Sequence, residues 1–194
     1  MNHQKILLLI AVEEELGTEA VAELRSRCDV ALTGVGKLNA FEATFAALQQ
    51  GPYDVVINLG TCGSMKHPAG TVLRPGIVAQ GDIYIDSVFA TAPEHLNTGC
   101  DTTSISSADN FIGADTPASQ LKLLEPYDCV DMESYAIVRA VKFHSQLTAT
   151  PAPKIEMIKV VSDMADETLD DWSARLESLR HTLLQALDDV LKIY

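Results

Sequence analysis

Short apolar runs alternate along the chain with segments of helical periodicity, and this alternation constrains the fold more than any other feature. The runs are rich in Val and Ile and bounded by turn residues, as is typical of strands covered on both faces. They lie at Ile6–Val12, Asp54–Asn58, Gly76–Ile85 and Ile155–Val161. Between them, apolar residues recur every three or four positions, which predicts helices at Glu14–Cys28, Leu38–Gln49, Glu133–Phe143 and Asp170–Leu191. The pattern predicts an α/β fold of three layers, α/β/α, around a central, mostly parallel, twisted sheet.

Length and composition favour one folded domain. The chain has 194 residues, of which 47% are hydrophobic. A chain of this size can bury one complete core, so we expect residues 1–194 to form a single domain. The run Ile6–Val12 leads directly into Glu13 and has no small-residue cleavage site, so we interpret it as a buried strand rather than a signal peptide. No stretch approaches the roughly 20 apolar residues that span a bilayer.

Charge and cysteine usage exclude several classes of partner. Lys and Arg total 14 against 27 Asp and Glu, a formal net charge of −13 that repels phosphate backbones and anionic lipid head groups. Nucleic acid and membrane surfaces are therefore not expected partners, whereas a neutral or cationic small molecule is compatible with this charge. The four cysteines form no C-x-x-C pair and have no neighbouring His cluster, so neither a metal site nor a disulfide framework is expected. We expect reduced thiols in a cytoplasmic protein.

Polar residues of unusual chemistry lie near the ends of the predicted strands. In open α/β sheets, ligands bind at the carboxyl ends of the strands, because loops and helix N-termini converge there. Three segments hold such positions, Glu13–Glu15, Gly60–Ser64 and Ser162–Asp166, and a fourth, Asp131–Glu133, lies directly before a predicted helix. These segments are the candidates for a ligand site.

Each candidate segment has a structural explanation as well as a functional one. Three successive glutamates complement a helix dipole, or one of them serves in catalysis. The glycines of Thr33–Lys37 and Asn58–Ser64 make tight turns, or they let a ligand approach backbone amides; neither segment matches a dinucleotide or P-loop fingerprint. In Asp131–Glu133 the acids favour a helix N-terminus, or the glutamate holds a vicinal diol through two hydrogen bonds. Asp163 and Asp166 cap a helix, or they act as acid and base across one bond.

Six segments, taken together and in order, resemble a known family. They are Ala11-Val-Glu-Glu-Glu-Leu16, Thr33-Gly-Val-Gly-Lys37, Ile57–Gly63, Ser107-Ala-Asp-Asn-Phe-Ile112, Val130-Asp-Met-Glu133 and Ser162-Asp-Met-Ala-Asp166. The chain resembles the nucleosidase branch of the purine nucleoside phosphorylase superfamily, whose members act on 5′-methylthioadenosine and S-adenosylhomocysteine. The segments span most of the chain, which makes chance agreement improbable.

The resemblance implies two catalytic residues. Glu15 would be the base that activates the attacking water, and Asp163 the acid that protonates the purine at N7. Cleavage of a glycosidic bond develops oxocarbenium character on the sugar, so the purine must be neutralised as it leaves. Asp163 must therefore bring a proton at working pH.

The resemblance also implies a set of substrate-binding residues. Glu133 would hold the ribose 2′ and 3′ hydroxyls, Met132 would pack against the sugar, and Phe111 would stack on the base while the backbone of Ile112 reads its edge. Trp172 falls near the family's aromatic lid of the 5′ pocket, although an anchoring role in an amphipathic helix explains it equally well. The full set is Val35, Thr61, Gly63, Phe111, Ile112, Met132, Glu133, Ser162 and Trp172.

The absence of two phosphate-binding arginines favours hydrolysis over phosphorolysis. Bacterial hexameric phosphorylases of the superfamily hold phosphate with arginines, one just before the glycine turn and one in an early glycine-containing loop. Here Asn58 stands at the first position, and no arginine precedes Arg25. Because charge-assisted donors provide most of the binding of phosphate, water is the expected nucleophile.

The chain departs from the family at three places. Family members are longer between about Asp86 and Ser104, where a partner subunit closes the pocket for the 5′ substituent, so the resemblance leaves the 5′ specificity open. Lys159 stands where the nucleosidases often have arginine, and Val12 where they often have methionine.

The leading hypothesis is a purine nucleosidase without cofactor or metal. It would hydrolyse the N-glycosidic bond of 5′-methylthioadenosine, S-adenosylhomocysteine or a related 5′-substituted nucleoside. The alternatives are a nucleoside phosphorylase, a futalosine hydrolase and a non-catalytic nucleoside-binding protein. The resemblance also implies a homodimer in which one subunit completes the pocket of the other.

Overall fold

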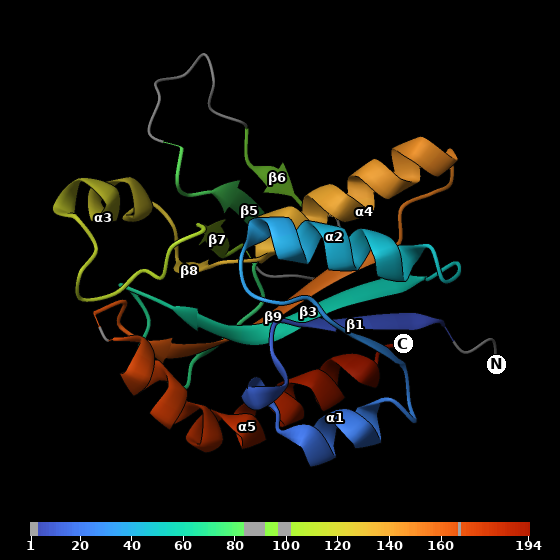
Figure 1. The fold of residues 1–194 in the computed structure, drawn as a ribbon, viewed down its shortest axis with the longest axis horizontal. Coiled ribbons are helices and arrows are strands. Elements are labelled where there is room, and N and C mark those ends of the chain that lie inside the picture. Colours follow the sequence, from blue (N-terminus) through green and yellow to red (C-terminus); the bar gives the residue numbers. More distant parts are fainter. Residues whose placement is uncertain (1–3, 84–91, 97–101, 167) are drawn as a thin grey trace.

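The fold is built around one sheet, described here from a computed structural model that covers residues 4–83, 92–96, 102–166 and 168–194 (Figure 1). In these residues the strands are β1 (Ile6–Ile10), β2 (Asp29–Leu32), β3 (Val55–Gly63), β4 (Val72–Leu73), β5 (Ile77–Gln80), β6 (Glu94–His95), β7 (Ser104–Ser107), β8 (Cys129–Asp131) and β9 (Lys154–Asp163). The helices are α1 (Thr18–Leu24), α2 (Lys37–Leu48), α3 (Ala118–Leu124), α4 (Ser134–Thr148) and α5 (Leu169–Leu191), with a 3-10 turn, η1, at Glu13–Glu15.

The strands pair mostly in parallel, as predicted. The main path runs β2-β1-β3-β8-β7-β5-β6, and β9 pairs with both β3 and β4. Among the described strands, the pairs β1–β2, β1–β3, β3–β9, β5–β7 and β7–β8 are parallel, while β3–β8, β4–β9 and β5–β6 are antiparallel. The long strands β3 and β9 lie side by side from end to end, so the residues at their carboxyl ends meet.

Helices cover both faces of the sheet and complete three layers, which confirms the predicted α/β/α class. Figure 1 shows α2 and α4 on one face and α1 and α5 on the other. The residues of β1 alternate between the two cores: Leu7 and Leu9 pack on the side of α2 and α4, whereas Leu8 and Ile10 pack on the side of α5. This alternation is the period of two that a strand imposes, and it explains why these runs are apolar throughout.

Four short or polar elements are not predicted by the apolar patterns of the sequence. β2 is a half-exposed edge strand, and β7 has the sequence Ser-Ile-Ser-Ser yet is buried. The three-residue strand β8 and the seven-residue helix α3 are too short to show a period. The sequence patterns predict none of these four elements. In β7 the reason is that burial of a serine is decided by hydrogen-bond partners that come from other elements.

Several predicted boundaries are wrong by a few residues. The first helix begins at Thr18 rather than at Glu14, because Gly17 has a φ of +82° that separates it from η1. The strand predicted at Gly76–Ile85 is observed at Ile77–Gln80, and residues 84 and 85 of that prediction lie outside the described residues. The second strand extends to Gly63, and the helix predicted to end at Phe143 continues to Thr148. Most of the segment in which the family is longer, between about residues 86 and 104, lies outside the described residues.

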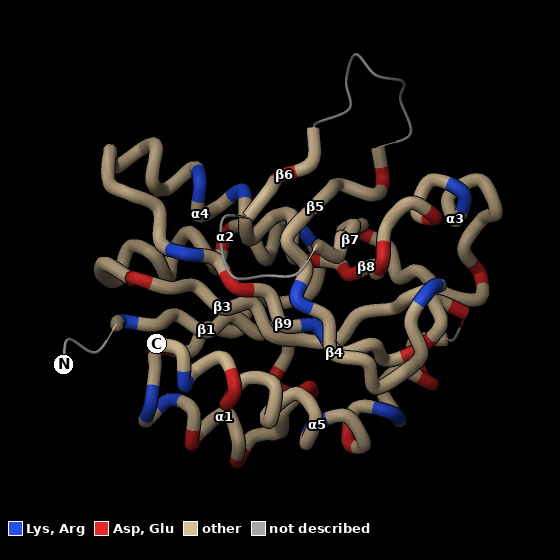
Figure 2. Tube along the Cα trace, turned by 180° about the vertical axis from the view of Figure 1, so that it is seen from behind, with Lys and Arg blue, Asp and Glu red and all other residues tan. Residues whose placement is uncertain are grey.

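Acidic side chains are spread over the molecule rather than confined to one region. Figure 2 shows Asp and Glu on α1 and α5 as well as near the strand ends. The net charge of −13 therefore acts over a broad surface, which disfavours a polyanionic partner.

Candidate active site

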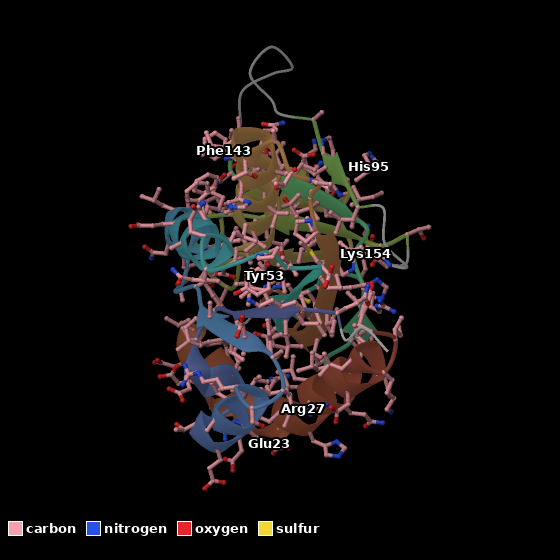
Figure 3. All side chains as sticks on the ribbon, turned by 90° about the vertical axis from the view of Figure 1, so that its right-hand side faces the viewer. Glu23, Arg27, Tyr53, His95, Phe143 and Lys154 are labelled. Atoms are coloured by element: carbon pink, nitrogen blue, oxygen red, sulfur yellow. The ribbon has the colours of Figure 1, made fainter. Side chains whose placement is uncertain are left out.

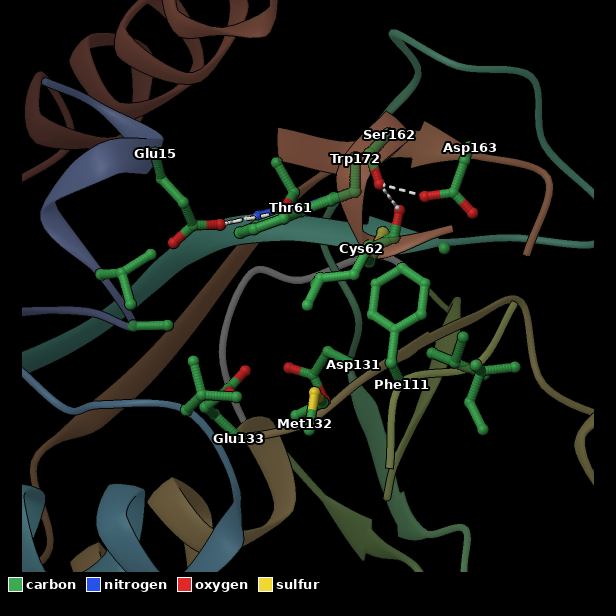
Figure 4. Close-up of a pocket in the computed structure, with 17 residues that line it drawn as sticks. Glu15, Thr61, Cys62, Phe111, Asp131, Met132, Glu133, Ser162, Asp163 and Trp172 are labelled. Atoms are coloured by element: carbon green, nitrogen blue, oxygen red, sulfur yellow. Dashed lines mark hydrogen bonds between the residues drawn. The ribbon is translucent and has the colours of Figure 1, made fainter. Parts of the chain in front are cut away.

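A cavity lies at the carboxyl ends of β1, β3 and β9, where the fold brings the candidate segments together (Figure 4). It encloses about 630 Å³ of empty space, a value that includes its open mouth. All eleven residues predicted for the site line it: Glu15, Val35, Thr61, Gly63, Phe111, Ile112, Met132, Glu133, Ser162, Asp163 and Trp172. The structure also adds Ala11, Val12, Cys62, Val130, Asp131 and Leu169 to its lining.

The Glu15 carboxyl is buried and held on one of its two oxygens. The backbone N–H of Thr61 donates to Oε1 at 2.7 Å, and the Thr61 hydroxyl donates to the same oxygen at 2.9 Å. Within the described residues, the buried Oε2 has no hydrogen-bond partner. Burial raises the pKa of Glu15, and the hydrogen bonds from Thr61 and the charge of Lys159 offset only part of that effect. Of the three successive glutamates, Glu15 points inward and Glu14 is exposed.

Gly60 provides the space that the Glu15 carboxyl occupies. A Cβ at this position would lie 3.0 Å from Oε1 and 3.1 Å from Oε2 of Glu15. These distances are shorter than a comfortable carbon–oxygen contact, and the carboxyl would have to move. This glycine of the Asn58–Ser64 segment therefore admits a side chain of the site itself.

Ser162 and Asp163 are consecutive residues, yet both line the cavity. In a regular strand, consecutive side chains point to opposite faces. Here the pairing of β9 with β3 is irregular: Val161 pairs with Cys62 and Asp163 with Gly63, which leaves Ser162 as an extra residue. A bulge of this kind re-aims side chains and explains why both face the ligand site.

The hydrogen bonds around Asp163 hold it in a defined orientation. Its Oδ1 accepts from the backbone N–H of Ala165 at 2.7 Å, and its Oδ2 lies 2.5 Å from the Ser162 hydroxyl. That hydroxyl also lies 3.1 Å from the carbonyl oxygen of Cys62. Capping of α5 is done by Thr168, whose hydroxyl accepts from the N–H of Asp171, so neither Asp163 nor Asp166 serves as that cap.

A buried lysine neutralises the acidic side of the cavity. Lys159 Nζ lies 2.9 Å from Asp131 Oδ2, and both side chains are only 2% exposed. Burial by itself lowers the pKa of Lys159, but the carboxylates of Asp131, Glu133 and Glu15 outweigh it and leave the pKa above its ordinary value. The ammonium is therefore charged, and it stabilises the ionised carboxyls around it.

The Asp131 carboxylate accepts hydrogen bonds from residues of β7 and α4 and so connects these elements to β8. Its Oδ1 accepts from the Ser107 hydroxyl at 2.5 Å, and its Oδ2 accepts from the backbone N–H of Ser134 at 3.1 Å. The Ser134 hydroxyl lies against both Asp131 and Asn58. Both acids of Asp131–Glu133 line the cavity, and Asp131 also connects the elements around it through its hydrogen bonds.

Glu133 lies at the N-terminus of α4 and receives a hydrogen bond from a distant turn. The backbone N–H of Gly36 donates to its Oε1 at 3.0 Å. Burial raises the pKa of Glu133 to about 7, and the nearby Asp131 carboxylate adds to the shift. The second glycine of the Thr33–Lys37 turn, with a φ of +92°, is therefore part of the support of the site.

An ion cluster connects that turn to the loop that carries Phe111. Lys37 Nζ lies 2.5 Å from Asp82 Oδ1 and 3.6 Å from Asp109 Oδ2, and its backbone N–H donates to Asp109 Oδ1 at 2.6 Å. The Asp109 N–H in turn donates to Asp82 at 2.9 Å. Because Gly36 precedes Lys37 and Phe111 follows Asp109 by two residues, the cluster holds two walls of the cavity in one arrangement.

Sequence signals existed for most of the residues that the predictions omitted. Cys62 lies between two predicted residues, and Asp131 is the partner of Glu133 in a recognised motif. Lys159 was noted as a departure from the family, but its burial and its pairing with Asp131 follow only from the register of β9. Leu169 had no signal, because its place depends on where α5 begins.

No group of three or more His, Cys, Asp or Glu residues in the described part of the chain is arranged to hold a metal ion. No described helix is both long and apolar enough to cross a membrane.

Known structures share this fold over nearly the whole chain. A 5′-methylthioadenosine/S-adenosylhomocysteine nucleosidase from Neisseria meningitidis, in complex with methylthio-immucillin-A, is 20% identical with a TM-score of 0.76, over 98% of this chain and 100% of that one. A futalosine hydrolase of Helicobacter pylori is 20% identical with a TM-score of 0.75, over 99% of each chain. A 5′-methylthioadenosine nucleosidase of Arabidopsis thaliana is 16% identical with a TM-score of 0.78, over 100% of this chain and 96% of that one.

These similarities establish the fold. No protein-family model matches the chain, and no curated protein matches it. The chain therefore shares the three-layer fold of the nucleosidases at an identity too low to transfer their substrates.

Proposed function

We propose that this protein is a purine nucleosidase that hydrolyses the N-glycosidic bond of 5′-methylthioadenosine, S-adenosylhomocysteine or a related 5′-substituted nucleoside. The observation that carries the proposal is the placement of two buried carboxyl groups, Glu15 and Asp163, apart from each other in one cavity (Figure 4). An aromatic ring, Phe111, and a third carboxyl, Glu133, line the same cavity.

The spacing of the two carboxyls suits direct attack by water. Glu15 contacts Thr61, and Asp163 lies against Gly63, two residues further along β3. Two residues of extended strand correspond to about 7 Å. Carboxyls supported at positions this far apart suit the arrangement of hydrolases that invert the sugar, in which a water molecule fits opposite the leaving group.

Glu15 would act as the base in this reaction. Its unpartnered Oε2 accepts a proton from water while the water oxygen bonds to C1′ of the ribose. The bond from C1′ to the purine nitrogen breaks, and its electron pair goes to the purine. The carboxyl must be ionised to act. Burial raises its pKa, whereas the hydrogen bonds from Thr61 and the charge of Lys159 favour the ionised form.

Asp163 would return a proton to the purine at N7. The Ser162 hydroxyl has one proton and lies near two acceptors, the Cys62 carbonyl oxygen and Asp163 Oδ2. The Ser162 hydroxyl and the backbone N–H of Ala165 hold the Asp163 carboxyl in one orientation in the cavity, where it would act as the acid.

The cavity lining favours water over phosphate as the nucleophile. Among the described residues that line it, none is an arginine or a lysine, whereas Glu15, Asp131, Glu133 and Asp163 are acidic. Asn58, at the position of a phosphate-binding arginine in phosphorylases, is buried and bonded to Ser134. A phosphate dianion would meet repulsion here rather than charge-assisted donors.

The test is the release of free base in a buffer without phosphate. We expect the purified protein to release adenine from 5′-methylthioadenosine, measured by chromatography, and Asp163→Asn to abolish the release. Futalosine and inosine, assayed in parallel, identify a different nucleoside. Release that requires phosphate would establish a phosphorylase, and binding without release of base from any of the three would establish a nucleoside-binding protein.

The proposal includes one domain, residues 1–194, acting as a homodimer in the cytoplasm. Several large apolar side chains on and beside α2 and α4 are exposed, among them Leu38 at 78%, Leu147 at 64% and Phe143, which Figure 3 labels on α4. A second subunit would cover them and lie close to Val35 of the cavity.

The free thiols of Cys28, Cys62 and Cys129 fit a reducing compartment. Light scattering after size-exclusion chromatography tests the dimer, and a monomer at micromolar concentration would contradict it.

A further inference from the structure

The indole of Trp172 is hydrogen-bonded to the residue that holds Glu15. Its Nε1–H donates to Thr61 Oγ1 at 3.0 Å, and Thr61 Oγ1 donates to Glu15 Oε1 at 2.9 Å. Trp172 is the single tryptophan of the chain, and it lies in the first turn of α5, far along the sequence from Glu15. Figure 4 shows Trp172, Thr61 and Glu15 on the same side of the cavity.

The direction of these hydrogen bonds follows from the chemistry of a hydroxyl group. Thr61 has one hydroxyl proton, whereas its oxygen can accept as well as donate. Because the indole N–H can only donate, it occupies an acceptor position of Oγ1 and leaves the hydroxyl proton to point at Glu15. The order of donors is therefore Trp172 to Thr61 to Glu15.

This arrangement makes the two oxygens of Glu15 different. Oε1 accepts from both the N–H and the hydroxyl of Thr61, at 2.7 and 2.9 Å. The buried Oε2 has no partner among the described residues. A carboxylate held through one oxygen keeps a fixed orientation and has a second oxygen without a partner among the described residues, as a base in direct attack by water requires.

The start of α5 fixes the position of the indole. Thr168 and Asp171 form a capping box, and the backbone N–H of Trp172 donates to the Thr168 carbonyl at 3.1 Å. The indole is therefore held by a defined helix terminus, and the hydrogen bond to Thr61 does not depend on a bound nucleoside.

We propose that Trp172 is a positioning residue that orients the general base Glu15 through the Thr61 hydroxyl. This inference rests on the proposed nucleosidase function, and it goes beyond the expected role of Trp172 as a wall for the 5′ substituent. With the N–H engaged by Thr61, only the ring face and edge of the indole are left for the nucleoside.

A double-mutant cycle separates positioning from direct contact with the nucleoside. Trp172→Phe keeps an aromatic wall and removes the N–H donor, and Thr61→Val keeps the shape and removes the hydroxyl. We expect each variant to lower kcat by about 3- to 10-fold, the factor of one net hydrogen bond, with KM changed by less than about twofold. In the double variant the loss should equal that of Thr61→Val alone, because the relay is already broken. Multiplied effects, or a raised KM with an unchanged kcat, would overturn the proposal.

Trp172 fluorescence tests the same coupling without turnover. The ionisable groups that face Glu15 are Lys159 from β9, Asp131 from β8 and Glu133 at the start of α4, and Asp163 lies across the cavity. We expect the emission of the nucleoside-free protein to change as Glu15 titrates. The change should be lost in Glu15→Gln and Thr61→Val and kept in Glu133→Gln, which removes another titrating group.

The fluorescence result decides the proposal even if no nucleoside is cleaved. An emission that does not respond to pH in the wild type, or that responds equally in Glu15→Gln, would show that the indole does not sense the carboxyl. If the coupling is present and no base is released from any nucleoside, the proposed function fails while the relay stands.

Discussion

Replacing Lys159 by methionine removes the cation from a buried group of carboxyls. Lys159 and Asp131 are each 2% exposed and paired at 2.9 Å, and Glu133 and Glu15 also interact with the ammonium. Methionine has a similar length and fills the same space with apolar atoms. The variant therefore leaves Asp131 buried without its counter-ion and changes little else.

The expected loss is large for a single substitution. Breaking a buried ion pair by removing one partner costs about 3–5 kcal/mol, because the remaining charge stays desolvated. For a chain of this size, each kcal/mol corresponds to roughly 2–4 °C in Tm, so the variant should melt about 6–20 °C lower. Urea unfolding at pH 7, followed by circular dichroism, measures the free energy directly.

A second variant tests the cause of the loss. Lys159→Met combined with Asp131→Asn removes both charges, while the Asn oxygen, in the place of Oδ1, can still accept from the Ser107 hydroxyl and the Ser134 N–H. We expect the double variant to recover at least about 1.5 kcal/mol relative to the single one. A single variant that loses less than about 1 kcal/mol, or a double variant no more stable than it, would refute the claim that Lys159 neutralises this cluster.

Three further predictions concern the walls of the cavity. The pKa of Glu133 in the folded protein, about 7, lies above the ordinary value of 4.5, so ionisation of Glu133 removes stability as pH rises from 4.5 through 7. Glu133→Gln should therefore be more stable than wild type by about 1–3 kcal/mol at pH 8. In urea unfolding, the difference should vanish near pH 4.5. Gly60→Ala should displace the Glu15 carboxyl by a few tenths of an ångström and lower kcat by about tenfold in the adenine-release assay, and wild-type kcat would contradict the close contact. Lys37→Met should raise KM by about 5- to 10-fold and leave kcat within about threefold, because the ion cluster holds nucleoside-binding walls rather than the reacting groups. Lys37→Arg is the charge-preserving control. A loss of kcat in Lys37→Met as large as its rise in KM would argue against this assignment.

The layered fold could be predicted because its determinants are local. The strands β1, β3, β5 and β9 contain apolar runs that can be buried on both faces, and α2, α4 and α5 show apolar periodicity. Elements without such a signal were missed, as the Ser-rich β7 shows, because its burial depends on partners such as Asp128 and Asp131 from later in the chain.

The ordered motifs indicated which residues belong in the cavity, but not how they act on one another. Sequence alone placed Glu15 and Asp163 near strand ends and Glu133 at the start of a helix, since apolar runs and the carboxylates that follow or precede them can be recognised in the sequence. The tertiary structure decided that Gly60 makes room for Glu15, that a bulge at Ser162 turns two consecutive side chains inward, and that Lys159 is buried against Asp131. It also placed Trp172 against Thr61 across more than a hundred residues. These interactions depend on strand register and on the start of a helix, which are set by packing of the whole chain, so no local pattern could reveal them.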